Sequence, residues 1–181
     1  MPPTIRPLPM RRTEKVHHLH GMRRIERTGP RTWTLLDEGG RMQGTKVQPS
    51  LWNARVELLL NKGLYTVKRL RLLSGVLSVC FGDTPVLEAR FKLNRTVIQD
   101  PATGAPVLTV QKKHWFSSEH LLTDAQGTVC ATIGTSVQWT RLRIEQQLLE
   151  EHGAPLEPLV LLFALHCIQV QQNRAAAGAA N

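Results

Sequence analysis

The residues best suited to chemistry in this 181-residue chain are Lys and Arg side chains of its central part. Both donate charge-assisted hydrogen bonds to phosphate, and the planar guanidinium can bind two oxygens at once. If neighbouring strands bring them together, they could hold the phosphorylated headgroup of an acidic lipid. The alternative is a solvated outer face of a sheet. Side-chain alternation along a strand favours it, because Lys68 would point to the opposite face of the sheet from Arg69 and Arg71. The candidates are Lys68, Arg69, Arg71, Arg90, Lys92, Arg95, Lys112 and Lys113.

A second candidate combines charge with aromatic side chains in Lys112-Lys113-His114-Trp115-Phe116. This combination could make interfacial lipid contact or stack on single-stranded nucleic acid. The alternative is that Trp115 and Phe116 cap the mouth of a barrel, and we favour it because isolated aromatic side chains more often pack than bind.

Catalytic and metal-binding patterns are missing from the sequence. It has neither a G-x-S-x-G nucleophile turn nor a glycine-rich phosphate loop, and Gly134-Thr135-Ser136 is predicted to be a simple turn. His17, His18 and His20 lack a carboxylate or thiolate that would complete a metal site. His166 lies within an apolar run, where its ring must find a hydrogen-bond partner or stay neutral, and it is predicted to be a core histidine with its hydrogen bonds satisfied. We therefore expect a non-enzymatic protein with no catalytic residues, no metal, no cofactor and no small-molecule substrate.

The formal charge of +9 is concentrated in the first 31 residues, which hold eight of the 23 Lys and Arg and two of the 14 Asp and Glu. This segment is interrupted by charge or proline throughout, which predicts a disordered arm and no secretory leader. Because little charge remains elsewhere, a nucleic-acid partner is disfavoured. Three widely spaced cysteines in apolar contexts predict small buried side chains in a reducing, cytoplasmic compartment. They are Cys80, Cys130 and Cys167.

From Thr32 the chain alternates short apolar segments with turn residues, which is typical of an all-β barrel or sandwich. Three segments, 32–47, 96–110 and 120–133, share one plan of apolar strand, Asp, Gly and apolar strand, which predicts three hairpins. No second acid falls where a calcium loop needs one. The predicted strands are 32–36, 41–47, 52–60, 64–73, 76–81, 86–92, 96–99, 107–112, 120–122, 128–133 and 137–146.

The segment Leu159–Ile168 (LVLLFALHCI) is a helix-length apolar run without a polar face. Such a helix must be buried on all sides or lie in lipid, and it covers only about half of the roughly 20 residues needed to cross a bilayer. We expect a sheet that closes around it. The predicted organisation is an arm (1–31), a barrel domain (32–174) with a central helix at 158–172, and a flexible tail (175–181). Residues 145–151 are predicted to be a helical or irregular rim.

Successive hairpins followed by a proline-flanked apolar C-terminal helix resemble the tubby C-terminal-like superfamily, which includes phospholipid scramblases and LURP-one-related proteins. The resemblance rests on residues 64–67, 96–110, 120–133 and 158–170, with 33–47 as a first hairpin. It implies a mainly β fold, in which an antiparallel closed barrel of about twelve strands encloses the C-terminal helix. It also implies binding to phosphoinositide headgroups or membranes, although no lipid-binding motif can be carried over to this chain residue by residue.

The leading hypothesis is therefore a cytoplasmic, non-enzymatic barrel that binds acidic phospholipid headgroups or a protein partner, peripherally at the membrane. Two alternatives remain open. Residues 159–170 could anchor the protein in a membrane, or the basic arm could bind nucleic acid. The sequence leaves the oligomeric state undetermined, and it allows a start at Met1, Met10 or Met22.

Overall fold

The fold consists of antiparallel strands and one C-terminal helix. The computed structural model describes residues 22–49, 55–69, 75–114, 117–138, 143–150 and 155–179. In these ranges the elements are β1 (Met22–Gly29), β2 (Thr32–Leu36), β3 (Met42–Val47), β4 (Val56–Leu60), β5 (Gly63–Arg69), β6 (Val76–Phe81), β7 (Thr84–Phe91), β8 (Arg95–Gln99), β9 (Pro106–Lys112), β10 (His120–Thr123), β11 (Val129–Gln138), β12 (Arg143–Glu150) and α1 (Pro158–Ala179).

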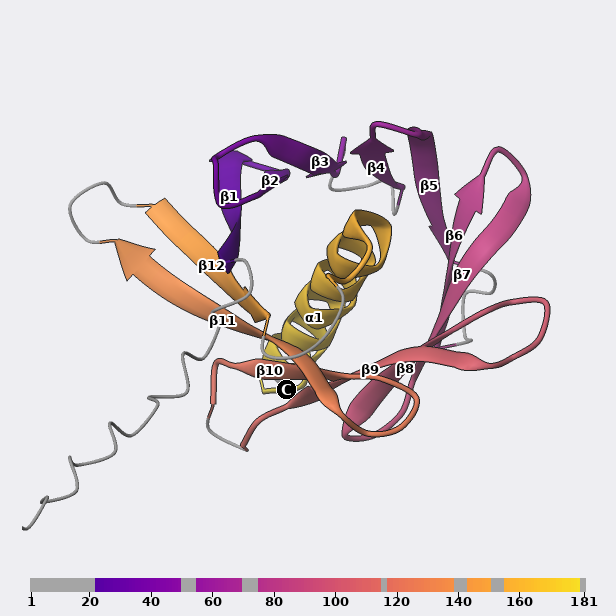
Figure 1. The fold of residues 1–181 in the computed structure, drawn as a ribbon. Coiled ribbons are helices and arrows are strands. Elements are labelled where there is room, and N and C mark those ends of the chain that lie inside the picture. Colours follow the sequence, from indigo (N-terminus) through magenta and orange to yellow (C-terminus); the bar gives the residue numbers. More distant parts are fainter. Residues whose placement is uncertain are drawn as a thin grey trace, which may run out of the picture.

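The strands form one antiparallel sheet in which each strand pairs with its neighbours along the chain. Strand β1 also pairs with β12, so that the order of hydrogen-bonded neighbours returns to its start as a closed barrel. Figure 1 shows the strands arranged around α1, which lies in the middle of the ring. The predicted class, mainly β with antiparallel strands and one C-terminal helix packed on them, is confirmed.

The core is formed by the inner face of the strands and by α1. Residues 161–165 of the helix are each 0% exposed. Five consecutive residues span more than one turn of about 3.6 residues, so the helix is covered on every side. This is the enclosure that the lack of a polar face predicts, and it places the segment proposed as a membrane anchor in the core. The strand residues buried in this cluster include Leu35, Leu58, Val79, Ala89, Ile98, Leu108, Val110, Leu122 and Ala131.

The three Asp-Gly hairpins form as predicted, because each turn satisfies its own backbone donors. In the β8–β9 turn, Asp100 Oδ1 accepts hydrogen bonds from the amides of Ala102 (2.8 Å) and Thr103 (2.9 Å). Asp37 and Asp124 also accept hydrogen bonds from backbone amides of their own turns, β2–β3 and β10–β11. Gly104 follows with a φ of 70°, which is the left-handed conformation that glycine adopts without strain.

The N-terminal boundary of the domain was predicted wrongly. The arm was expected to extend to residue 31, but Met22–Gly29 is the strand β1, which pairs with both β2 and β12. The buried side chain of Arg23 donates from Nη1 to the carbonyl of Leu156, 2.9 Å away. The basic composition of this segment suggested disorder, but the strand is stabilised by contacts with β12 and Leu156, far away in the sequence. Residues 1–21, including His17, His18 and His20, lie outside the described residues.

Two predictions in the second half of the chain were also wrong. Residues 145–151 were expected to be helical or irregular, but Arg143–Glu150 is β12, between β11 and β1. Gly134-Thr135-Ser136 is not a turn but part of β11, where the three residues pair with Gln147, Gln146 and Glu145. Pairing on both sides outweighs the helix-favouring side chains of β12, because strand formation depends strongly on tertiary context.

The C-terminal helix is longer than predicted. It begins at Pro158, as the sequence indicates, and the Leu161 amide donates to the Glu157 carbonyl at 3.1 Å. It ends at Ala179 instead of 172, so that residues 175–179 of the predicted flexible tail are helical. No helix in the described residues combines the length and apolar character needed to cross a bilayer. Of the three free cysteines, Cys80 and Cys167 are buried as predicted, whereas Cys130 is partly exposed.

Candidate anion-binding rim at the exit end

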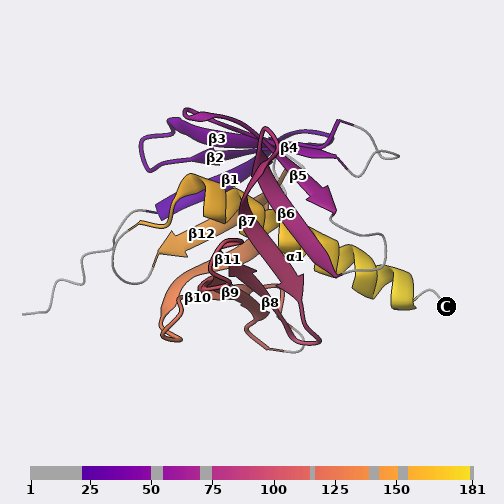
Figure 2. The ribbon, with the colours of Figure 1, turned by 90° about the vertical axis from the view of Figure 1, so that its right-hand side faces the viewer.

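The barrel has two ends, and α1 runs from one to the other. In an antiparallel ring, the connections after odd-numbered strands lie at one end and those after even-numbered strands at the other. Near the start of the helix, Glu157 pairs with Lys62 of the β4–β5 turn at 3.2 Å. Near its end, Gln171 Nε2 donates to Thr96 Oγ1 at the start of β8, 2.7 Å away. The helix therefore leaves at the end that follows the odd-numbered strands, which we call the exit end. Figure 2 shows the C-terminal part of α1 extending beyond the strands there.

The two ends differ in charge. The Asp-Gly turns place Asp37, Asp100 and Asp124 at the end opposite the exit. The exit end instead carries cations at the junctions of strands and connections. Arg69 is the last residue of β5, Lys112 is the last residue of β9, and Arg95 is the first residue of β8. This separation follows from antiparallel topology, because the turns that contain aspartate all follow even-numbered strands.

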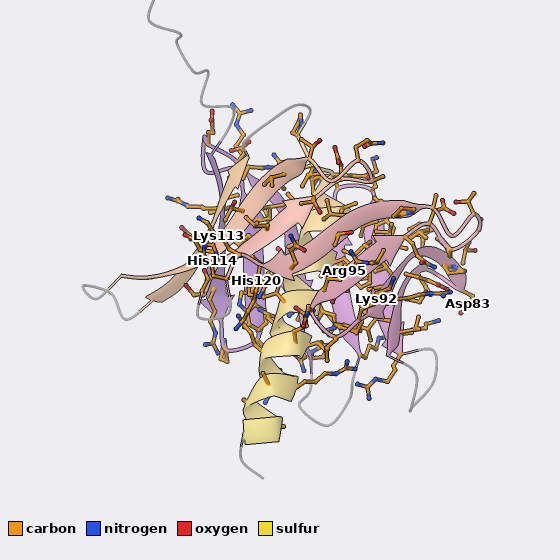
Figure 3. The ribbon with its side chains drawn as sticks, turned by 90° about the horizontal axis from the view of Figure 1, so that it is seen from below. Asp83, Lys92, Arg95, Lys113, His114 and His120 are labelled. Carbon is orange, nitrogen blue, oxygen red and sulfur yellow. The ribbon has the colours of Figure 1, made fainter. Side chains whose placement is uncertain are left out.

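Four cations surround the point where the helix leaves. Lys92 and Arg95 flank the β7–β8 turn, which is closed by a hydrogen bond from the Lys92 amide to the Arg95 carbonyl at 2.8 Å. Arg95 lies opposite Gln111, which precedes Lys112 in β9. We call Lys92, Arg95, Lys112 and the helix residue Arg174 the exit rim. Figure 3 shows Lys92 and Arg95 side by side.

The helix fixes the inner side of this rim. The Arg174 guanidinium carbon lies 4.5 Å from the centroid of the Phe91 ring, and Phe91 is the last residue of β7. Lys112 lies opposite the buried His120 of β10, and its positive charge adds to burial in lowering the pKa of His120. Among the described residues, none of the four rim cations forms an ion pair, and all four are exposed. The rim thus presents cations whose charge no described carboxylate neutralises.

The other predicted site residues are distributed differently. Lys68 Nζ pairs with Asp83 Oδ1 at 3.1 Å, and Lys113 Nζ pairs with Glu119 Oε2 at 2.7 Å. Arg90 lies 4.0 Å from Glu88 on β7. Figure 3 places Asp83 beyond Lys92, and Lys113 and His114 near His120. Arg69 is exposed at the exit end, whereas Arg71, Trp115 and Phe116 lie outside the described residues. Three predicted residues therefore belong to the rim, and Arg174 was not predicted.

A buried polar cluster near the same end was not predicted either. Lys46 of β3 is 0% exposed, and its Nζ donates to Gln169 Oε1 of α1 at 2.6 Å. The same nitrogen lies 3.8 Å from the centroid of the Trp33 ring, which provides a cation–π contact. Arg27 lies over the same ring at 5.7 Å. No ion pair of Lys46 with a carboxylate is found among the described residues.

Burial changes the proton affinity of this cluster. It lowers the pKa of Lys46 to about 7, because the charged form has lost its water. It also lowers the pKa of His166 to about 3, with a further contribution from the charge of Lys46. His166 Nδ1 is buried and has no hydrogen-bond partner in the described part of the chain. The prediction of a neutral core histidine agrees with this direction, but the hydrogen-bonded partner expected for Nδ1 is missing there.

Comparison with known proteins supports the fold. No protein-family model matches the chain, and no curated protein matches its sequence. Among solved structures, the chain is similar to a protein from Arabidopsis thaliana whose X-ray structure is known, with a TM-score of 0.55 and 9% sequence identity over 86% of this chain and 93% of that chain. At this identity the likeness concerns the fold alone.

Proposed function

We propose that the protein is a tubby/scramblase-like barrel whose exit rim binds the headgroups of acidic phospholipids, peripherally at a cytoplasmic membrane surface. The observation that carries this proposal is the rim itself. Three separate segments bring exposed cations to one end of the barrel, and no described carboxylate pairs with them. The resemblance in sequence layout supports the same assignment.

The chemistry of the rim suits phosphate. Arg95 and Arg174 can each bind two phosphate oxygens in a bidentate manner, whereas Lys92 and Lys112 act as point charges. The contacts of α1 with Phe91 and Thr96 hold the rim in place before a ligand arrives. Each cation near an anionic surface contributes about 1 kcal/mol, so four would contribute on the order of 4 kcal/mol at low salt. Such binding is reversible and weakens as salt screens the charges.

Co-sedimentation with lipid vesicles tests this proposal. The protein is expected to bind phosphatidylserine-containing vesicles more strongly than pure phosphatidylcholine vesicles, and to dissociate as salt is raised. The variant Lys92→Gln/Arg95→Gln removes two rim cations and is expected to weaken partitioning by about 2 kcal/mol, roughly thirtyfold. The matched control Arg41→Gln/Lys62→Gln removes the same charge from the opposite end and is expected to bind nearly as the unchanged protein does.

Two outcomes would contradict the proposal. Equal partitioning onto neutral and anionic vesicles at low salt would exclude recognition of acidic headgroups. Equal weakening in both double variants would show that net charge, and not the rim, causes binding.

A further inference from the structure

The β7–β8 turn carries an apolar side chain between two cations of the rim. Leu93 is 99% exposed, more than any other large hydrophobic side chain in the described residues. Lys92 precedes it and Arg95 follows two residues later. A single exposed leucine is ordinary on a protein surface. This one differs because it occupies the turn that joins two neighbouring strands at the exit end, where exposed cations lie on both sides.

We infer that Leu93 inserts into the outermost apolar layer of an anionic bilayer while the exit rim binds the surrounding headgroups. This inference rests on the proposed function and extends it from a headgroup to a membrane surface. A bilayer presents anionic groups above an apolar layer, and the turn presents the complementary arrangement of cations behind an apolar tip. When the Leu93 side chain inserts, the rim cations on either side of it remain in the headgroup region, where they stay hydrated and contact the anionic headgroups.

The turn is held in shape before it meets a membrane. The Lys92 amide donates to the Arg95 carbonyl at 2.8 Å, and the Phe91 amide donates to the Gly75 carbonyl at 3.0 Å. Behind the turn, Thr96 accepts a hydrogen bond from Gln171 of α1. Because these contacts already order the backbone, insertion needs no refolding and costs little conformational entropy. The turn is therefore a preformed tip supported by the central helix.

A protein partner fits these observations less well. A stable protein interface buries on the order of 1,000 Å² or more, and its centre is usually apolar and poor in charge. The tip offers one apolar side chain with cations on both sides. A bilayer needs no shaped counterpart, and burying one leucine side chain is worth roughly a ten- to hundredfold change in partitioning.

A fluorescent probe at the tip tests the inference in the full chain. Leu93→Cys is labelled with an environment-sensitive nitrobenzoxadiazole group in a Cys130→Ser background, because the other two cysteines are buried. On phosphatidylserine-containing vesicles, the emission is expected to shift to the blue and to be quenched by lipids that carry a spin label near the headgroup. The control Met42→Cys is labelled in the same background at the opposite end, where Met42 is 61% exposed, and its emission is expected to stay unchanged.

Substitution of the tip gives an independent measurement. Leu93→Ser is expected to lower partitioning onto anionic vesicles about tenfold, whereas Leu93→Phe retains it. Thermal unfolding of both variants is expected to match that of the unchanged protein, because the Leu93 side chain is 99% exposed. If the protein binds anionic vesicles but the label at position 93 does not respond and Leu93→Ser binds equally well, the insertion is refuted while headgroup binding stands. If no form binds anionic vesicles, the proposed function itself fails, and the insertion fails with it.

Discussion

Replacing Lys46 by methionine is expected to stabilise the protein at neutral pH and to have a smaller effect as the pH rises. Lys46 is 0% exposed and its ammonium group faces Gln169 and Trp33 without a carboxylate partner in the described residues. A buried charge without an ion pair is costly, and apolar replacements of similar volume are often neutral or stabilising. Methionine keeps a flexible chain of similar length, and the partly exposed Gln169 can bind water instead.

The size of the effect follows from proton linkage. The pKa of Lys46 is about 7 in the folded protein, against 10.5 for an ordinary lysine, which is the value for the unfolded chain. Between these values the unfolded chain binds the proton and the folded protein does not, so the free energy of unfolding rises with pH. The slope is about 1.4 kcal/mol per pH unit, which amounts to a gain on the order of 3 to 4 kcal/mol between pH 7 and 10. The Lys46→Met variant lacks this gain.

Urea denaturation of both proteins at intervals from pH 7 to pH 10 provides the assay. The difference in unfolding free energy between variant and parent is expected to shrink steadily as pH rises, while other titrating groups cancel in the difference. The control Lys92→Met makes the same substitution at an exposed lysine and measures the effect of removing a surface charge over the same pH range. A constant difference for Lys46→Met over the same range would show that Lys46 does not titrate there, and the argument from burial would fail.

Three further predictions concern the core. Leu162→Asp places a carboxylate at a fully buried position of α1 and is expected to abolish folded protein, so a cooperative melt by circular dichroism would contradict the enclosure of the helix. Gly44→Ala introduces a Cβ that would lie 2.6 Å from Leu60 Cδ2 and 3.0 Å from Leu162 Cδ1, and a loss of about 1 to 3 kcal/mol in chemical unfolding is expected, whereas an unchanged midpoint would contradict the close approach of strand and helix. His166 stays neutral in the fold down to pH about 3, so stability is expected to fall as pH drops below 6.5; His166→Leu is expected to lose less over that range, and equal losses would refute this role for His166.

Much of the fold was predictable because its signals are local. The aspartates of the three repeated hairpins accept hydrogen bonds from amides within four residues, so the turn chemistry is complete in a short stretch of sequence. The absence of a polar face on Leu159–Ile168 likewise required a cover on every side, and the strands provide it.

The failures concern elements whose stability comes from distant partners. Strand β1 has a basic sequence that suggests disorder, yet it pairs with β12. In this pairing, Ile25 of β1 lies opposite Gln146 of β12. Neither segment shows its partner in its own composition, because strand propensity is weak compared with pairing and burial. Sequence reasoning can find a strand from its pattern only when that pattern is regular.

The candidate site shows the same division. Lys92, Arg95 and Lys112 were identifiable from their positions at or next to the ends of predicted strands. Arg174 was missed because helix α1 was expected to end before it, and only the packing of α1 against Phe91 brings it to the rim. Lys46 was missed because an isolated lysine in a short strand is usually exposed, and only the pairing of β3 with β2 and β4 decides that it faces inward.

The ring closure between β1 and β12 has a consequence for how the chain reaches its native state. The barrel can close only when residues 22–29 pair with residues 143–150. The apolar surface of α1 is buried only when the strands surround it. Contacts of such large sequence separation slow folding, because the chain loses the entropy of closing a long loop before the stabilising strand pairing forms. We therefore expect slow refolding through a partly folded species in which the apolar helix α1 is exposed. Because such a species aggregates, dilution or a chaperone is expected to raise the yield of refolded protein.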